Sequence, residues 1–156
     1  SLNQSLESLK EHLKTVNVRL DHLEELVAES DQRKAETLQT MASLRNSTLR
    51  NPILRINPVP AYIPERGIIH PSTDLFPKTA KEFYSLRNPF NDRQRRMLEY
   101  LAAFYDVPYD SPLDVDSDTS EGNQAFNRQE VAVSMLEGIL GLNEENFVRF
   151  RTRALE

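Results

Sequence analysis

The sequence predicts an all-α protein with a long N-terminal coiled-coil helix, a proline-rich extended linker and a small C-terminal bundle of about four short helices. Two observations predict this fold class. Leucine or valine recurs at alternating spacings of three and four residues up to Val27, which is the repeat of helices that wind around each other. Prolines then crowd one stretch, and helix-capping patterns follow it. The predicted segments are 1–50, 51–77 and 78–156, with an acidic loop at 109–123.

The first segment carries an uninterrupted aliphatic seam. In a heptad written abcdefg, every a and d position is aliphatic, and these positions form the predicted oligomer interface of Leu2, Leu6, Leu9, Leu13, Val16, Leu20, Leu23 and Val27. This repeat resembles a leucine zipper, which implies dimerisation. A homo-oligomer, with a dimer as the first expectation, or a hetero coiled coil would bury the seam, and packing on the protein's own globular part is the alternative.

The heptad register breaks after Val27. Continued without a change, it would place Ser30, Lys34 and Thr37 in the seam. A four-residue stutter would instead bring Ala35, Leu38, Ala42 and Leu49 onto the contacting face. The helix is expected to end near Asn51, because Pro52 disfavours a helical residue before it.

The linker is too apolar to be a free tether. Prolines at positions 52, 58, 60, 64, 71 and 77 oppose a regular helix and favour extended chain. Large apolar residues between them predict that the strip lies along a hydrophobic groove, either of the downstream domain or of a protein partner. The candidate docking residues are Ile53, Leu54, Ile56, Val59, Tyr62 and Ile63.

Capping patterns place the C-terminal helices. Thr79 with Glu82, Asn91 with Gln94 and Asn127 with Glu130 each match an N-cap followed three residues later by Glu or Gln. Gly141 suits a left-handed corner, and Asn143 is expected to cap a last helix. Leu142 and Phe147 match a hydrophobic staple around that cap. The final residues alternate like a strand, but they are predicted to be helical because no other convincing strand exists to pair with them.

The acidic loop does not match a metal site. Asp114, Asp116 and Asp118 have the spacing of a calcium loop, but Thr119 and Ala125 replace the glycine and the glutamate that such a loop requires. A solvated loop in which serines beside acids could be phosphorylated fits better. No metal and no cofactor are expected.

Composition argues against an enzyme. The chain has 156 residues, no cysteine, three histidines and four glycines. Without cysteine there is no thiolate chemistry, and four glycines are few for a glycine-rich phosphate loop. The formal net charge of −5 argues against a dedicated nucleic-acid binder. Two arginine clusters remain candidate phosphate contacts in a nucleic-acid module: Arg93, Arg95 and Arg96, and Arg149, Arg151 and Arg153.

These observations predict a non-catalytic adaptor or scaffold fragment. Its coiled coil would associate with itself or with another helix, and its C-terminal helical domain would dock a protein partner within a larger assembly. A nucleic-acid-associated module and a self-assembling filament or shell protein are the alternatives. No apolar run is long enough to span a membrane. We expect an intracellular location, nuclear or cytoplasmic. The first residue is serine rather than methionine, which suggests a piece of a longer protein.

Overall fold

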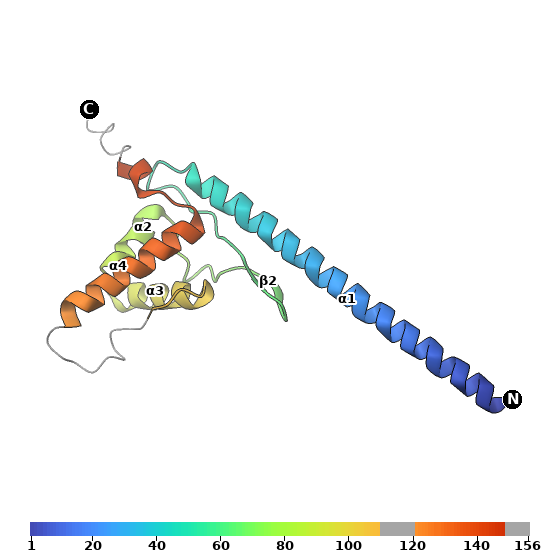
Figure 1. The fold of residues 1–156 in the computed structure, drawn as a ribbon. Coiled ribbons are helices and arrows are strands. Elements are labelled where there is room, and N and C mark those ends of the chain that lie inside the picture. Colours follow the sequence, from blue (N-terminus) through green and yellow to red (C-terminus); the bar gives the residue numbers. More distant parts are fainter. Residues whose placement is uncertain (110–120, 149–156) are drawn as a thin grey trace.

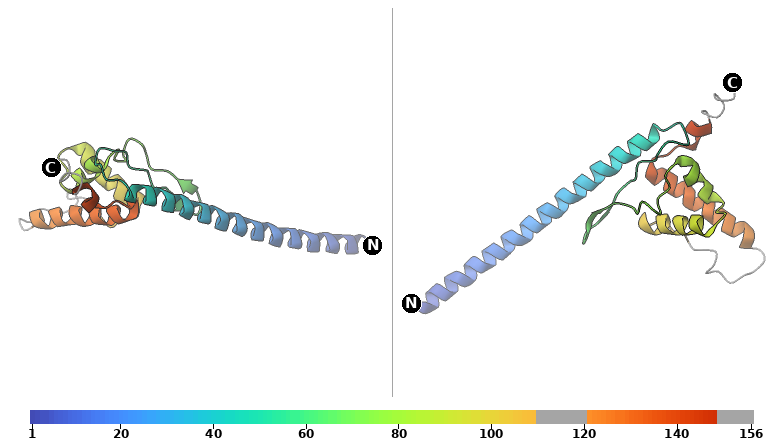
Figure 2. Two further views of the ribbon diagram at one scale, coloured as in Figure 1. Left: turned by 90° about the horizontal axis from the view of Figure 1, so that it is seen from above. Right: turned by 180° about the vertical axis from the view of Figure 1, so that it is seen from behind.

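One long helix dominates the protein. The structure is a computed structural model that describes residues 1–109 and 121–148, apart from the side chains of 121–127. Helix α1 spans Leu2–Ser47, 46 residues, which at 1.5 Å per residue is about 69 Å of helix. Its N-terminal part projects away from the rest of the molecule, whereas its C-terminal part lies beside the other helices (Figures 1 and 2). The predicted all-α fold class is confirmed, although a small sheet is also present.

The sheet is a hairpin inside the proline-rich segment. Strands β1 (Ala61–Ile63) and β2 (Gly67–Ile69) pair antiparallel. The Arg66 amide donates to the Ile63 carbonyl over 3.0 Å, and Gly67 then adopts a φ of 80°. A tight turn followed by a left-handed residue is a common way to connect two strands. The expectation that the chain has no other convincing strand was therefore wrong, whereas the segment was correctly expected to be extended.

The rest of the segment is extended and lies against the C-terminal helices. The Ile56 amide donates to the Lys78 carbonyl over 2.9 Å, and Arg55 forms an isolated antiparallel bridge with Thr79. The Lys81 amide also donates to the Pro52 carbonyl over 3.0 Å. These backbone bonds hold the extended strip beside the start of the next helix.

The capping patterns located the first two short helices. Helix α2 (Ala80–Tyr84) follows the Thr79 cap and runs into the 3-10 helix η1 (Ser85–Arg87), and α3 (Asp92–Phe104) follows the Asn91 cap. Each cap side chain accepts a hydrogen bond from the amide three residues later. The Glu82 and Gln94 side chains reach back to the amides of Lys78 and Phe90, one residue before each cap.

Helix α4 begins earlier than predicted. It spans Glu121–Leu140, so Asn127 lies inside it, and residues 121–123 are helical rather than part of the acidic loop. Gly141 has a φ of 76°, and residues 144–148 are helical again behind Asn143, whose side chain accepts from the Glu145 amide. The loop prediction for 110–120, with its phosphorylation sites, and the helix prediction for 149–156 lie outside the described residues.

The hydrophobic core lies between the extended strip, the short helices and α4. The buried side chains include Phe83, Leu86, Met97, Leu101, Leu136 and Leu140, all at 2% exposure or less. Leu142 and Phe147 are buried in the same cluster, as expected for the staple that joins α4 to the last helical turn.

Helix α1 joins this core only near its C-terminal end. Ala42 belongs to the core cluster, and α1 contacts α4 and both strands of the hairpin. A side-chain Cβ at Gly141 would overlap Ser43 of α1. The glycine therefore permits close approach of the two helices as well as the left-handed turn.

Candidate functional site

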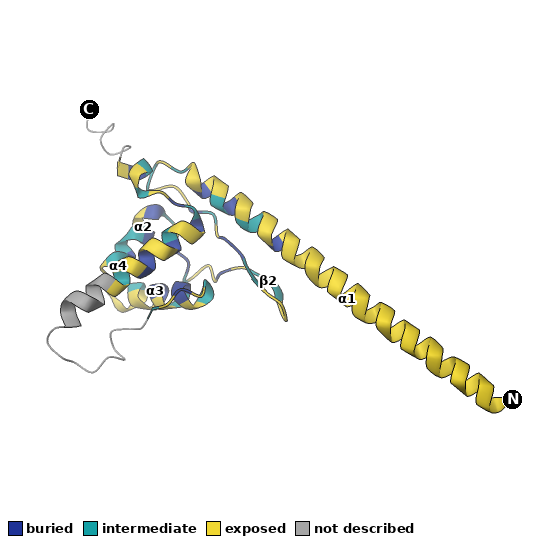
Figure 3. Ribbon diagram, in the orientation of Figure 1, coloured by how far each residue is buried: buried dark blue, intermediate teal, exposed yellow. Residues whose placement is uncertain are grey.

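The eight seam residues form a free apolar stripe on the projecting part of α1. Every one of them is between 49% and 83% exposed, and this part of the helix is coloured as exposed throughout (Figure 3). The seam does not pack on the protein's own globular part in this structure. Exposed aliphatic residues in a strict heptad order are unusual on a surface that faces only water.

The contacting face changes after the register break. Ala35 and Ala42 are buried, and Leu38 and Leu49 are partly buried. The stutter groups the same four residues, although Leu49 lies just beyond the end of α1 at Ser47, and their burial places them against the protein's own domain. One helix therefore presents its first apolar stripe to solvent and its second to its own domain.

A buried asparagine fixes this second stripe. The Asn46 side chain is fully buried, and its Nδ2 donates to the carbonyl oxygens of Leu140 and Asn57 over 2.8 and 2.9 Å. Its Oδ1 accepts from the Asn57 amide over 2.7 Å. A single side chain thus joins α1, the extended strip and the end of α4, and a buried amide needs such partners.

The hairpin lies beside one end of the exposed seam. A pocket of about 480 Å³, called the hairpin pocket below, lies between α1 and the hairpin, and it is lined by Leu20, Leu23, Val27, Tyr62, Pro64 and Gly67 among others. The Tyr62 hydroxyl donates to the Ala28 carbonyl over 3.3 Å. Three seam residues therefore form one wall of a hollow whose opposite wall is the hairpin turn.

Some of the predicted docking residues are exposed and others are buried. Ile53, Leu54 and Ile63 are 67%, 50% and 42% exposed, so their side chains are available to another molecule. Ile56 and Val59 are 4% and 3% exposed and belong to the core. These two residues are therefore not available as docking contacts, contrary to the prediction, because the groove they occupy belongs to their own domain.

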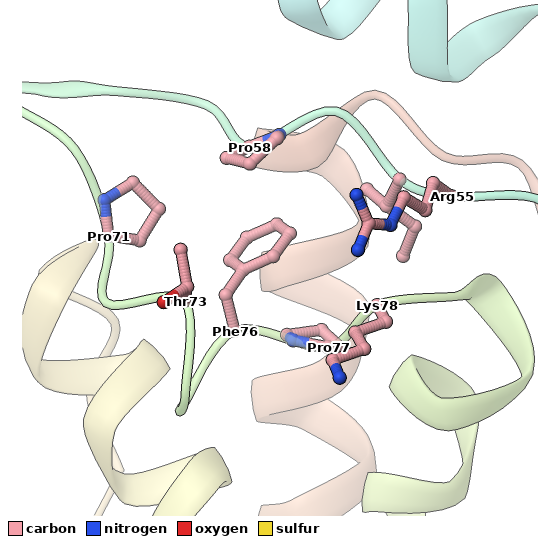
Figure 4. Close-up of a pocket in the computed structure, with 8 residues that line it drawn as sticks. Arg55, Pro58, Pro71, Thr73, Phe76, Pro77 and Lys78 are labelled. Atoms are coloured by element: carbon pink, nitrogen blue, oxygen red, sulfur yellow. The ribbon is translucent and has the colours of Figure 1, made fainter.

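A second pocket lies in the extended strip. It has a volume of about 170 Å³, with the Phe76 ring at its centre and Arg55, Pro58, Pro71 and Lys78 around it (Figure 4). The lining is mostly apolar, and its cationic side chains are exposed at the rim. His70, read from the sequence as a structural residue, is exposed next to this strip.

The described arginines of the two candidate clusters lie on α3. Arg93, Arg95 and Arg96 are exposed. Arg93 lies 3.8 Å from a Glu82 carboxylate oxygen, and Arg95 lies 3.5 Å from Asp92. Arg149, Arg151 and Arg153 lie outside the described residues.

Arg87 is engaged within the domain. Its Nη1 and Nη2 donate to the two carboxylate oxygens of Glu144 over 2.8 and 2.5 Å, and its guanidinium carbon lies 5.0 Å from the Tyr84 ring centre. The Tyr84 hydroxyl donates to Glu137 over 2.5 Å. Burial, followed by the Glu137 hydrogen bond, raises the pKa of Tyr84 well above its usual range. This polar cluster holds η1 against α4 and residues 144–148.

Sequence reasoning missed the hairpin and the role of Asn46. The run from Ile63 to Gly67 did contain a signal, because a proline followed three positions later by glycine suits a turn with a left-handed last residue. For Asn46 there was no local signal. Its two main partners, Asn57 and Leu140, are 11 and 94 residues away in the chain.

No protein-family model, no curated protein and no solved structure matches this chain. Within residues 1–109 and 121–148, no helix has the length and hydropathy to cross a membrane. The same described residues contain no cluster of three His, Asp or Glu side chains suited to hold a metal ion.

Proposed function

We propose that this protein is a non-catalytic scaffold subunit that associates with itself through the seam of α1. The observation that carries the proposal is the exposure of all eight seam residues, none of them below 49%. Burying a leucine side chain stabilises an assembly by about 1.5 to 3 kcal/mol. A second helix along the seam would recover this free energy for several residues at once.

The shape of the molecule supports a scaffold. Helix α1 is anchored at one end by Ala42 and Asn46, whereas its other end projects far from the helical domain. Self-association through the projecting end leaves the helical domain exposed to other molecules. Its exposed Ile53 and Leu54, just beyond the end of α1, form an apolar spot on which a protein partner could be held.

The test is the absolute mass of the full chain by light scattering during gel filtration, compared between two lysine variants. Leu13 and Val18 are 61% and 67% exposed on the same helix, but only Leu13 lies in the seam. The L13K variant should shift an oligomer to monomer because the lysine charge would be buried in the contact. The V18K variant should keep the wild-type mass.

Two results would count against self-association. A wild-type chain that is monomeric at tens of micromolar would leave the seam without a second copy. An oligomer that survives L13K would place the contact elsewhere on the molecule.

A further inference from the structure

The hairpin pocket lies at one end of the seam, so the two ends of the seam are not equivalent. Leu20, Leu23 and Val27 face the hairpin turn, whereas Leu2, Leu6 and Leu9 lie on the projecting end. A second copy placed on the seam must meet this asymmetry. Its orientation decides which of its residues enter the hollow.

We infer that two copies pair antiparallel along α1, and that the projecting end of each copy fills the hairpin pocket of the other. The inference rests on the proposed function, because it specifies the geometry of the same self-association. In this arrangement the pocket is filled by the leucines at the projecting end of a second copy of this chain.

The seam matches itself when it is reversed. In a two-fold symmetric contact, residue i of one copy meets residue j of the other, and j meets i. An antiparallel arrangement pairs every a residue with a d residue and leaves none of the eight unpaired. The resulting layers are Leu2 with Val27, Leu6 with Leu23, Leu9 with Leu20 and Leu13 with Val16, and the two-fold axis repeats them.

This register brings the right residues to the pocket. The partner residues opposite Leu20, Leu23 and Val27 are the three leucines at the projecting end. The pocket volume of about 480 Å³ and its apolar wall suit these aliphatic side chains. In a parallel pair, the residues opposite Leu20, Leu23 and Val27 would be the same three residues of the partner, which already line that copy's own hairpin pocket.

Charge favours the same orientation. The segment 20–31 carries five acidic side chains and no lysine or arginine, whereas the segment 2–19 carries two acidic and three basic ones. A parallel pair would bring the two acidic segments side by side. The antiparallel pair separates them, because residues 20–27 of each copy then lie beside residues 2–9 of the other, whose only charged side chain is Glu7. A parallel pair gains Arg19 opposite Glu24, but an exposed pair of this kind contributes little.

Orientation can be measured directly because the chain has no cysteine. We would mix full-length L6C and L23C chains of different tag length, allow them to exchange under reducing conditions, and then oxidise them. The antiparallel register predicts a disulfide between L6C and L23C chains. A parallel register predicts L6C with L6C and L23C with L23C, a result that would overturn the inference while leaving self-association intact.

A second measurement avoids changes in the seam. A spin label on N3C lies beside the seam. In an antiparallel pair, the distance along the axis between the two labels would correspond to about 23 residues, or about 35 Å. A parallel pair would hold the two labels within about 20 Å, which contradicts the inference. A monomeric mass with neither a disulfide nor a dipolar signal would remove the proposed function itself. The V18C chain, whose cysteine lies outside the seam, is the control for the disulfide experiment.

Discussion

The side-chain amide of Asn46 donates a hydrogen bond of 2.8 Å to the carbonyl oxygen of Leu140, 94 residues further along the chain. Asn46 is the only buried polar or charged residue among those the structure describes. Its bonds to Leu140 and Asn57 join three segments, so this residue sets where the projecting helix leaves the domain.

The first prediction concerns this junction. Asn46→Ala should lower the free energy of unfolding by about 3 kcal/mol, because it leaves the Asn57 amide and two carbonyl oxygens without their partner in a buried place. Urea unfolding at one fixed protein concentration measures the loss. Asn88→Ala is the control, since Asn88 is exposed and should change stability by less than about 0.5 kcal/mol. Equal effects of the two variants would contradict the role of Asn46.

The second prediction separates two demands on glycine. Gly67 and Gly141 have φ values of 80° and 76°, but a Cβ at Gly67 meets nothing within 4 Å, whereas one at Gly141 would overlap Ser43. Gly67→Ala should cost only the backbone strain, about 1 kcal/mol. Gly141→Ala should cost clearly more, because the backbones of α1 and α4 must also separate. Thermal unfolding of both variants compares their stability. Similar losses of stability would show that the close approach to Ser43 does not contribute to it.

Local patterns predicted the elements that local chemistry determines. The Thr79 and Asn91 caps lie at the starts of α2 and α3, because the cap side chain and the amide it serves are three residues apart. The register break was also visible, since Ala35 and Ala42 fit the apolar spacing that Ser30 and Lys34 interrupt. Burial of Ala35 and Ala42 follows that break.

The missed features depend on contacts that are distant in the chain. The strands have three residues each, too short to give a periodic signal, and Pro64 and Gly67 favour a turn more visibly than they favour the strands beside it. The start of α4 was placed at Asn127, although the helix begins at Glu121. A capping pattern marks a position where a helix can begin, and it does not prevent an earlier start.

The third prediction concerns alkaline pH. Burial raises the pKa of Tyr105, and burial with the Glu137 hydrogen bond raises that of Tyr84. A raised pKa in the folded state means that the folded protein keeps its proton where the unfolded chain, with a pKa of about 10, has lost it. Stability is therefore complete below about pH 10 and falls as the pH rises further, by up to about 1.4 kcal/mol per pH unit for each tyrosine.

Unfolding by urea at several pH values between about 9 and 11 tests this dependence. Tyr84→Phe and Tyr105→Phe should each give a shallower fall than the wild type, because phenylalanine has no proton to lose. The difference from the wild type isolates the tyrosine, since the lysines titrate in all the proteins alike. A slope that is unchanged in both variants would contradict the assignment.

The last prediction concerns the Arg87–Glu144 pair, which ties η1 to residues 144–148. Two parallel hydrogen bonds and the Tyr84 ring hold the planar guanidinium. Arg87→Ala should lower the free energy of unfolding by about 1 to 2 kcal/mol. Arg87→Lys should restore less than half of this, because a single ammonium cannot form both bonds or stack on the ring. Arg93→Ala provides the control in the same urea titration, since Arg93 is 63% exposed and 3.8 Å from its partner and should cost less than about 0.5 kcal/mol. Full restoration by lysine would mean that charge alone matters at this position and that the two-bond geometry contributes nothing.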